Sequence, residues 1–441
     1  MFRTDINYRK QRLIKLLYAI EKNQNEIAKA LNNDFKKTEF EAFLTETFIV
    51  ISELKLTIKN MKKWAKPNMV LPSILNFPSL DYIYKEPYGK VLIISPWNYP
   101  FQLAVSPAIA AIAAGNSVTI KPSELTPNTS KLIAKIFSEV FEKEHVEVIQ
   151  GGIEVSQELL SRRWEYIFFT GSVNVGKIVA KAAAENLTPV TLELGGKNPC
   201  IIDKKVDLDV AARRIAWGKF VNAGQTCIAP DFLLVEKSVK EELTKKLIHE
   251  IETSYGTNQQ NSNDYPRIIT KKNWERLLGF TKNQKIIYGG KHNENDLFLS
   301  PTLIDEPSLE SPVMQEEIFG PILPILTFEN KNQINKIIER YEKPLALYVF
   351  SNNKKFSEDL IKNLSFGGGC VNDTLVHFAN NRLPFGGVGH SGIGAYHGKL
   401  SFNIFSHQKA IVKKPTWLDI KLRYAPYKNK INALKKIAKW L

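Results

Sequence analysis

Cys227 is the strongest candidate nucleophile in the sequence. It ends the polar phrase Asn222-Ala-Gly-Gln-Thr-Cys227, which follows a predicted helix near residues 207–220. Free cysteines are mostly buried and behave as small hydrophobic residues, so a structural role is the competing interpretation. A thiol at an exposed bend suits covalent catalysis, because the thiolate is the attacking form. Cys200 and Cys370 lie in or beside apolar runs, and we interpret both as structural.

Two further residues have the chemistry to assist a nucleophile. Glu193 lies in the apolar run Val190-Thr-Leu-Glu-Leu-Gly-Gly. Burial there raises the pKa of a carboxyl group and makes it a base nearer neutrality. Asn98, in Pro96-Trp-Asn-Tyr-Pro100, follows a predicted strand and has an amide that can donate to an oxyanion. The competing interpretations are an outward-facing strand residue for Glu193 and an ordinary turn asparagine for Asn98.

Four residues that follow predicted strands are candidates for binding a nucleotide. Lys121 and Glu124 present an amine and a carboxylate, which can bind ribose hydroxyls. Gly171 and Ser172 open a predicted helix, whose free N–H groups and positive end attract phosphate. Ordinary turns remain the alternative at both places. The seven histidines form no cluster with cysteine or acidic residues at metal-ligand spacing, so we predict no metal site.

Alternating elements are predicted to position these residues. Two amphipathic helices are expected in the first sixty residues, with Leu13 to Leu31 on the apolar face of one and Leu44 to Met61 on that of the other. From Val91, short apolar runs alternate with helical stretches, which is typical of βαβ units and a parallel sheet. Ligands of such a doubly wound sheet gather at the carboxyl ends of its strands. A second α/β stretch is expected from Gly195 to about Phe366.

Composition places the chain among ordinary globular proteins. It has 441 residues, enough for two or three domains, with 44% hydrophobic and 24% charged residues. Three cysteines indicate a reducing compartment, and the start of the chain has no apolar stretch of the kind found in secretory signals. We therefore predict a cytoplasmic protein. The net charge of +15 is concentrated at the end, where residues 413–441 hold nine basic residues and one acidic residue. A nucleic-acid surface across the main body is not supported.

Six phrases together resemble a known family. PWNYP, KPSE, FTGS, LELGGK, GQTC and EEIFGP occur here in the order seen in the NAD(P)-dependent aldehyde dehydrogenase superfamily. The short length, APD after the cysteine, and LPFGGVGHSGIGAYHGKLSF followed by FSHQK resemble its class 3 branch, which acts on fatty and aromatic aldehydes. The resemblance spans roughly residues 30 to 412.

The resemblance implies an oxidation of aldehydes to carboxylic acids through a cysteine thiohemiacetal and thioester. Cys227 would be the nucleophile, Glu193 the general base, and Asn98 the oxyanion donor together with the backbone N–H of Cys227. The cofactor, NAD or NADP, would contact residues Trp97, Lys121, Glu124, Gly171, Ser172, Gly176, Leu194, Glu317 and Phe319. The choice between the two stays open, because Lys121 suits a 2′-phosphate and Glu124 opposes it.

The resemblance also implies a domain plan. Residues 1–79 and 89–194 would form the dinucleotide-binding domain, and residues 195–375 an α/β catalytic domain. Residues 80–88 and 395–412 would form a small β bridging element, followed by the basic tail 413–441. Class 3 relatives are dimers, so a homodimer is expected.

The tail departs from the family pattern. Its predicted helix, residues 430–441, has Ile431, Leu434, Ile437 and Leu441 on one face, beside many lysines. One hypothesis is that this helix rests on an anionic membrane surface; the alternative is a solvated or dimer-packed helix. Two alternatives to the leading function also stay open: an enzyme that passes its acyl group to coenzyme A, and a basic membrane-associated binding protein that keeps only the fold.

Overall fold

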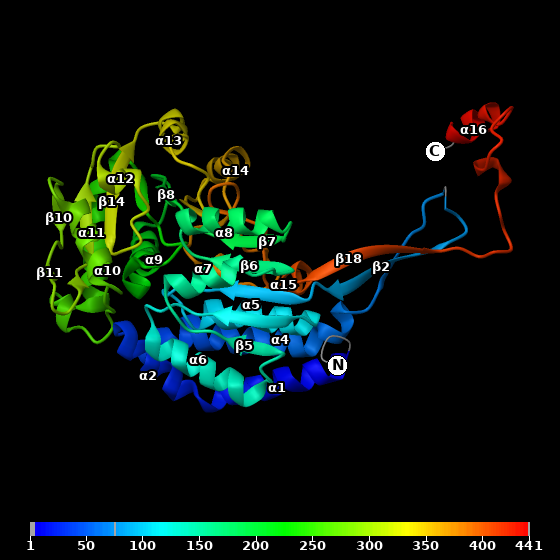
Figure 1. The fold of residues 1–441 in the computed structure, drawn as a ribbon. Coiled ribbons are helices and arrows are strands. Elements are labelled where there is room, and N and C mark those ends of the chain that lie inside the picture. The colour runs from blue at the N-terminus through cyan, green and yellow to red at the C-terminus, as the bar shows by residue number, and fades with distance from the viewer. Residues whose placement is uncertain (1–4, 75, 440–441) are drawn as a thin grey trace.

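Two sheets of mainly parallel strands form the centre of the computed structural model, which describes residues 5–74 and 76–439 (Figure 1). The first sheet is parallel except at one edge, where β17 runs antiparallel to β7. Its strands, in spatial order, are β17 (Gly392–Ile393), β7 (Val190–Glu193), β6 (Tyr166–Thr170), β3 (Lys90–Ile94), β4 (Ser117–Lys121) and β5 (Val146–Val148). The predicted doubly wound parallel sheet is confirmed.

Helices cover this first sheet, and their sequences explain how they pack. α5 (Gln102–Ala114) is buried along its whole length, because it has an all-round apolar surface of Ala, Ile and Val. α8 (Val173–Glu185) begins directly after β6, and the Ser172 hydroxyl caps it by accepting the Val175 N–H at 3.4 Å. The crossover connections between the other strands of this sheet contain α6 (Pro127–Val140) and α7 (Ile153–Ser161).

The N-terminal region differs from the prediction of two helices. The first predicted helix is broken at Asn23, whose backbone ends α1 (Ile6–Lys22) and whose side chain donates to the Ala19 carbonyl. α2 (Gln24–Phe35) then starts at once. After Lys36, which adopts a left-handed conformation, come the short α3 (Glu39–Ala42), a π-helical turn (Phe43–Thr47) and α4 (Phe48–Trp64).

The second sheet has seven strands and is parallel except for β10. Its strands, in spatial order, are β10 (Ile286–Tyr288), β13 (Thr302–Asp305), β14 (Ile322–Phe328), β9 (Phe232–Glu236), β8 (Pro199–Ile202), β15 (Ala346–Phe350) and β16 (Gly368–Val371). The helices of this region are α9 (Leu208–Phe220), α10 (Lys240–Tyr255), α11 (Lys271–Thr281), α12 (Pro312–Gln315), α13 (Lys331–Ile338) and α14 (Lys354–Asn363). The second α/β stretch is thus present as predicted.

A three-stranded antiparallel arm extends away from this body (Figure 1). It consists of β1 (Asn68–Val70), β2 (Leu80–Pro87) and β18 (Ser406–Lys413), which follows α15 (Gly398–Ile404). Segments 80–88 and 395–412 therefore lie together, while the domain limits themselves stay a prediction. At the far end of the arm lies α16 (Ile431–Ala438). Of the predicted tail residues, Leu441 and the side chain of Ile437 lie outside the described part of the structure.

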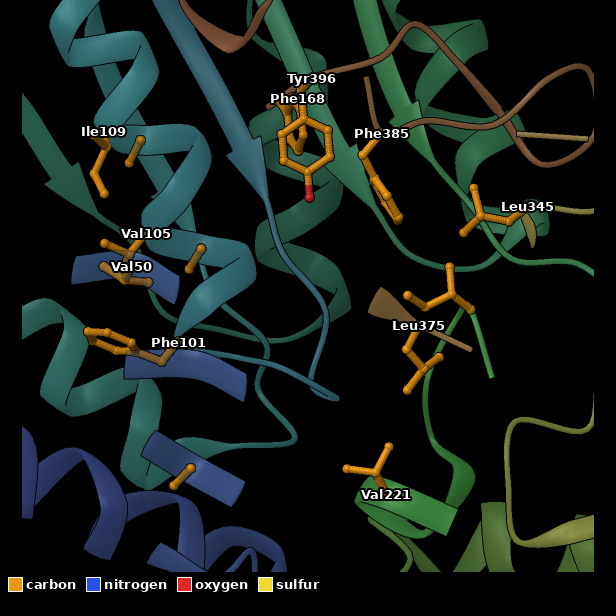
Figure 2. Close-up of a cluster of buried hydrophobic side chains, with 14 of the residues drawn as sticks. Val50, Phe101, Val105, Ile109, Phe168, Val221, Leu345, Leu375, Phe385 and Tyr396 are labelled. Carbon is orange, nitrogen blue, oxygen red and sulfur yellow. The ribbon is translucent and has the colours of Figure 1, made fainter. Parts of the chain in front are cut away.

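One buried hydrophobic cluster spans both halves of the body. Figure 2 shows two groups of its members, Val50, Phe101, Val105 and Ile109 in one and Val221, Leu345 and Leu375 in the other, with Phe385 and Tyr396 between them in this view. No helix in residues 5–74 and 76–439 is both long enough and apolar enough to cross a bilayer.

Candidate active site

The loop that holds Cys227 is shaped by a left-handed turn after α9. Asn222 and Ala223 have φ values of 55° and 51°, which forces the chain out of the helix. Beyond the turn, the Asn198 amide donates to the carbonyl of Cys227 at 2.7 Å, and the Tyr348 hydroxyl donates to that of Ile228 at 2.7 Å. The backbone at the thiol and directly after it is therefore held by Asn198, which precedes β8, and by Tyr348 of β15.

Asn98 lies directly against this loop. It is 3% exposed, and its amide Nδ2 donates to the Gln225 carbonyl at 3.1 Å, two residues before Cys227. Next to it, the hydroxyls of Tyr99 and Thr226 share a hydrogen bond of 2.6 Å. An amide nitrogen carries two hydrogens, so Asn98 keeps one for an oxygen atom placed beside the thiol.

Glu193 ends β7 and is 3% exposed. Neither of its carboxylate oxygens has a hydrogen-bond partner among the described residues. Burial raises the pKa of Glu193 well above its ordinary value. A carboxyl group in this condition accepts a proton readily, which is the property that a general base needs.

Cys227 and Glu193 line the same cavity, which has a volume of about 340 Å³. Burial, with smaller contributions from the Glu317 and Glu193 carboxyl groups, raises the pKa of the Cys227 thiol to about 12. The thiol is therefore protonated in the free protein near neutral pH, and attack on a substrate requires an acceptor for its proton. The walls are largely apolar and include Phe48, Leu103, Trp217, Leu375 and Phe378.

Glu317 is held by residues that the sequence analysis did not single out. Lys197 pairs with Asp231 at 2.5 Å, both nearly buried, and also donates to the Glu316 carbonyl at 2.9 Å. Asp231 accepts the Ile318 N–H at 2.9 Å, and Arg276 donates to the Glu317 carbonyl at 3.1 Å. Lys197 stands inside the phrase LELGGK and Asp231 inside APD, so the motifs contained a signal for both.

The Glu317 carboxylate also packs directly against Gly195. A Cβ atom added at Gly195 would come within 2.2 Å of its Oε2 atom, so this close approach requires glycine. Burial, with a smaller contribution from the nearby Asp231 carboxylate, raises the pKa of Glu317 to about 8. Two residues on, the Phe319 ring meets the Trp97 ring edge-on, with centroids 5.4 Å apart.

The other nucleotide-binding candidates lie at the carboxyl edge of the first sheet. Lys121, the last residue of β4, pairs with Glu124 at 2.5 Å. Gly171 and Ser172 follow β6 and begin α8. Gly176 packs so closely on Leu194 that an added Cβ would lie 2.6 Å from that side chain. An amine, a carboxylate and a helix N-terminus at one edge have the chemistry that a dinucleotide requires.

Comparison with known proteins identifies the family. Residues 1–411 match the aldehyde dehydrogenase family. The chain belongs to the aldehyde dehydrogenase family. It is 48% identical to the 4,4'-diaponeurosporen-aldehyde dehydrogenase of Staphylococcus aureus, over 98% of this chain and 94% of that protein. It is 44% identical to the dimeric NADP-preferring aldehyde dehydrogenase of Canis lupus familiaris, over 96% and 93%.

A solved structure agrees with this membership. The substrate-bound state of Staphylococcus aureus AldH has a TM-score of 0.96 and 48% identity, with 98% of this chain and 95% of that chain covered. The predicted resemblance and fold class are thus confirmed. The chain is an NAD(P)-dependent aldehyde dehydrogenase that oxidises aldehydes to carboxylic acids. The alternative of a binding protein that keeps only the fold is set aside.

Proposed function

We propose that Cys227, Glu193 and Asn98 carry out the aldehyde oxidation. The observation that carries this proposal is the shared cavity, in which the Cys227 thiol and the unpaired, buried Glu193 carboxylate both line the wall. Asn98 supports it from the side, since its amide is bonded to the backbone two residues before the thiol.

In this mechanism, the Cys227 sulfur attacks the aldehyde carbon and gives up its proton to solvent water, so that Glu193 stays free for the later hydrolysis. The oxygen of the thiohemiacetal takes up negative charge and accepts hydrogen bonds from Asn98 Nδ2 and the Cys227 N–H. The NAD(P) cofactor would supply the hydride acceptor that this oxidation needs, with its nicotinamide end held beside Glu317 and Phe319. Glu193 then takes a proton from water, which attacks the thioester and releases the acid.

The residues at the carboxyl edge of the first sheet fit the dinucleotide. We assign Lys121 and Glu124 to the adenosine ribose, and Gly171, Ser172 and Gly176 to the pyrophosphate, because the start of α8 has free N–H groups. A second set would hold the nicotinamide end: Trp97, Leu194, Glu317 and Phe319.

The cavity supports an apolar aldehyde as the substrate. Most of its lining residues are apolar or aromatic, with Leu, Ile, Phe and Val the largest group, and such walls favour an apolar chain because binding removes apolar surface from water. The relative named for 4,4'-diaponeurosporen-aldehyde agrees with this proposal. Water is the proposed acyl acceptor, because a buried general base in the same cavity as the thiol can activate water for hydrolysis. Transfer of the acyl group to coenzyme A would not need a base that activates water.

Replacing Asn98 by alanine is expected to lower kcat by about 10²–10³-fold, because one oxyanion donor contributes about 3–4 kcal/mol in comparable sites. The measurement is steady-state formation of the reduced dinucleotide. Asn128→Ala is the matched control, since it removes an exposed amide that is bonded to Asp34 and does not line the cavity. Near-normal turnover in the Asn98 variant would refute the assignment.

We further propose a cytoplasmic homodimer that touches anionic membranes through residues 413–441. The name of the dimeric relative supports the dimer. The tail supports membrane contact, since its nine basic residues accompany exposed Ile431 and Leu434 on α16.

The membrane contact is testable by sedimentation with vesicles of phosphatidylserine and phosphatidylcholine. The full chain is expected to pellet with these vesicles and to be released by salt. A chain that ends at Lys413, which keeps β18 intact, is expected to stay in the supernatant. Vesicles of phosphatidylcholine alone are the control. Equal pelleting of the two chains contradicts the proposal.

A further inference from the structure

A buried ion pair lies beneath the loop that holds Asn98. Lys37 Nζ is 2.7 Å from Glu46 Oε1, and both side chains are 0% exposed. Removing two charges from water is costly, so a pair in this position needs other contacts to offset that cost. Neither residue lines the cavity or belongs to the first sheet.

The pair contacts Asn98 itself and the residues that follow it. The second oxygen of Glu46 accepts the backbone N–H groups of Phe101 and Gln102, at 2.8 and 3.2 Å. Lys37 Nζ donates to the Asn98 carbonyl at 3.5 Å and lies 4.2 Å from the centre of the Tyr99 ring. Phe101 is itself anchored, because its ring is buried in the hydrophobic cluster that includes Val50 of α4 (Figure 2).

A second contact from the same segment reaches the Cys227 loop. Glu41 accepts the Asn222 N–H at 3.2 Å, at the left-handed turn that leads to the nucleophile. The Asn222 amide donates to the carbonyls of Asn98 and Gln225, at 3.0 and 3.1 Å. Residues 37–46 therefore contact both the Asn98 loop and the Cys227 loop. The two loops contact each other where the Asn98 amide donates to the Gln225 carbonyl.

Local structure explains how so short a segment reaches both loops. The left-handed Lys36 turns the chain after α2, and Thr38 caps α3 by accepting the Glu41 N–H at 3.0 Å. Glu46 then falls within the π-helical turn Phe43–Thr47. Such turns insert an extra residue into a helix, re-aim side chains, and are frequent at functional sites.

We propose that Lys37 and Glu46 are positioning residues for aldehyde oxidation, which set the place of the Asn98 amide relative to the Cys227 backbone. This inference rests on the proposed role of Asn98 as oxyanion donor. The pair touches neither substrate nor thiol and acts through the backbone of residues 98–102.

A double-mutant cycle on kcat tests the proposal. Glu46→Gln alone is expected to lower kcat by roughly 10- to 100-fold, since displacing a reacting group by about 1 Å costs on the order of 100-fold. In the Asn98→Ala background, the same change is expected to lower kcat less than about twofold, because the group that Glu46 positions is already gone. If the two losses multiply, the positioning role is wrong.

The same cycle separates this proposal from the proposed function. Near-normal kcat in Asn98→Ala alone would refute the oxyanion role of Asn98, and the positioning role with it. A slow Asn98→Ala enzyme with multiplying losses would refute only the positioning role. A variant with Lys37→Met and Glu46→Gln removes both charges together, so that no unpaired charge stays buried if Glu46→Gln alone fails to fold. It is expected to show the same non-additivity.

The rate at which iodoacetamide alkylates Cys227 separates a displaced Asn98 from a general loosening of the fold. A loosened fold would change this rate, whereas a displaced Asn98 amide would not. Alkylation needs the thiol but no oxyanion donor, so Glu46→Gln is expected to leave its rate within about twofold. A rate that changes in parallel with kcat would overturn the proposal. Asp305→Asn is the control for stability, because it breaks the ion pair with Lys240 away from the cavity and is expected to keep kcat.

Discussion

Replacing Cys227 by alanine is expected to abolish aldehyde oxidation while dinucleotide binding is retained. Without the sulfur, no thiohemiacetal forms, and the loss should be on the order of 10⁴-fold or more. Binding should persist because the proposed dinucleotide contacts lie on other elements, at the ends of β4 and β6 and beside Gly195. Steady-state absorbance of the reduced nicotinamide measures the first effect, and nucleotide titration measures the second.

Cys370→Ala is the matched control for this variant. Cys370 is also a free, partly buried thiol, but it lies on β16, its Sγ atom is 3.5 Å from His377 Nδ1, and it does not line the cavity. Its removal is expected to leave turnover near normal. If activity survives in Cys227→Ala and disappears in Cys370→Ala, then Cys370 is the nucleophile and the proposed role of Cys227 is wrong.

Replacing Glu193 by glutamine is expected to trap the acyl-enzyme. Glutamine fits the same space but cannot take a proton from water, so the thioester forms and then persists. General-base catalysis contributes about 10²–10⁴-fold, and steady-state turnover should fall by that factor. The first turnover should still appear as a burst of reduced dinucleotide equal to the enzyme concentration. Mass spectrometry of the quenched protein should find the acyl group on Cys227.

Hydroxylamine provides the control for the Glu193 variant. It attacks a thioester without help from a general base, so its addition is expected to restart turnover of the trapped enzyme. A variant that is merely misfolded would not respond. The proposed role is contradicted if product forms slowly with no burst and no adduct on Cys227.

The candidate site residues that could be chosen from the sequence lie in short, local motifs, and among them Glu193 and Cys227 line one cavity in the structure. Glu193 follows an apolar strand run, and Cys227 lies in a polar bend, so each had a recognisable environment within about ten residues. The alternation of apolar runs and helical stretches likewise predicted the parallel sheets, because both faces of such strands are buried.

The remaining features depend on contacts between distant segments. Glu46 bonds to the Phe101 N–H, 55 residues later, and Lys197 pairs with Asp231, 34 residues later. No local sequence pattern predicts which residues form such pairs. The break at Asn23 was also missed, because the apolar spacing continues from Ile20 to Ile27 through it. The apolar period predicts that a helix exists, but it is a weak guide to where the helix stops.

The edge of the first sheet beside Glu193 has a consequence for how the enzyme is made. β17 pairs with β7 so that Gly392 lies opposite Glu193, and Leu194 donates its N–H to the Ser391 carbonyl at 3.1 Å. During synthesis on the ribosome, β7 therefore stays unpaired on this side while some two hundred further residues are added. The strand that completes the sheet beside Glu193 is therefore made only after Cys227 and most of the chain.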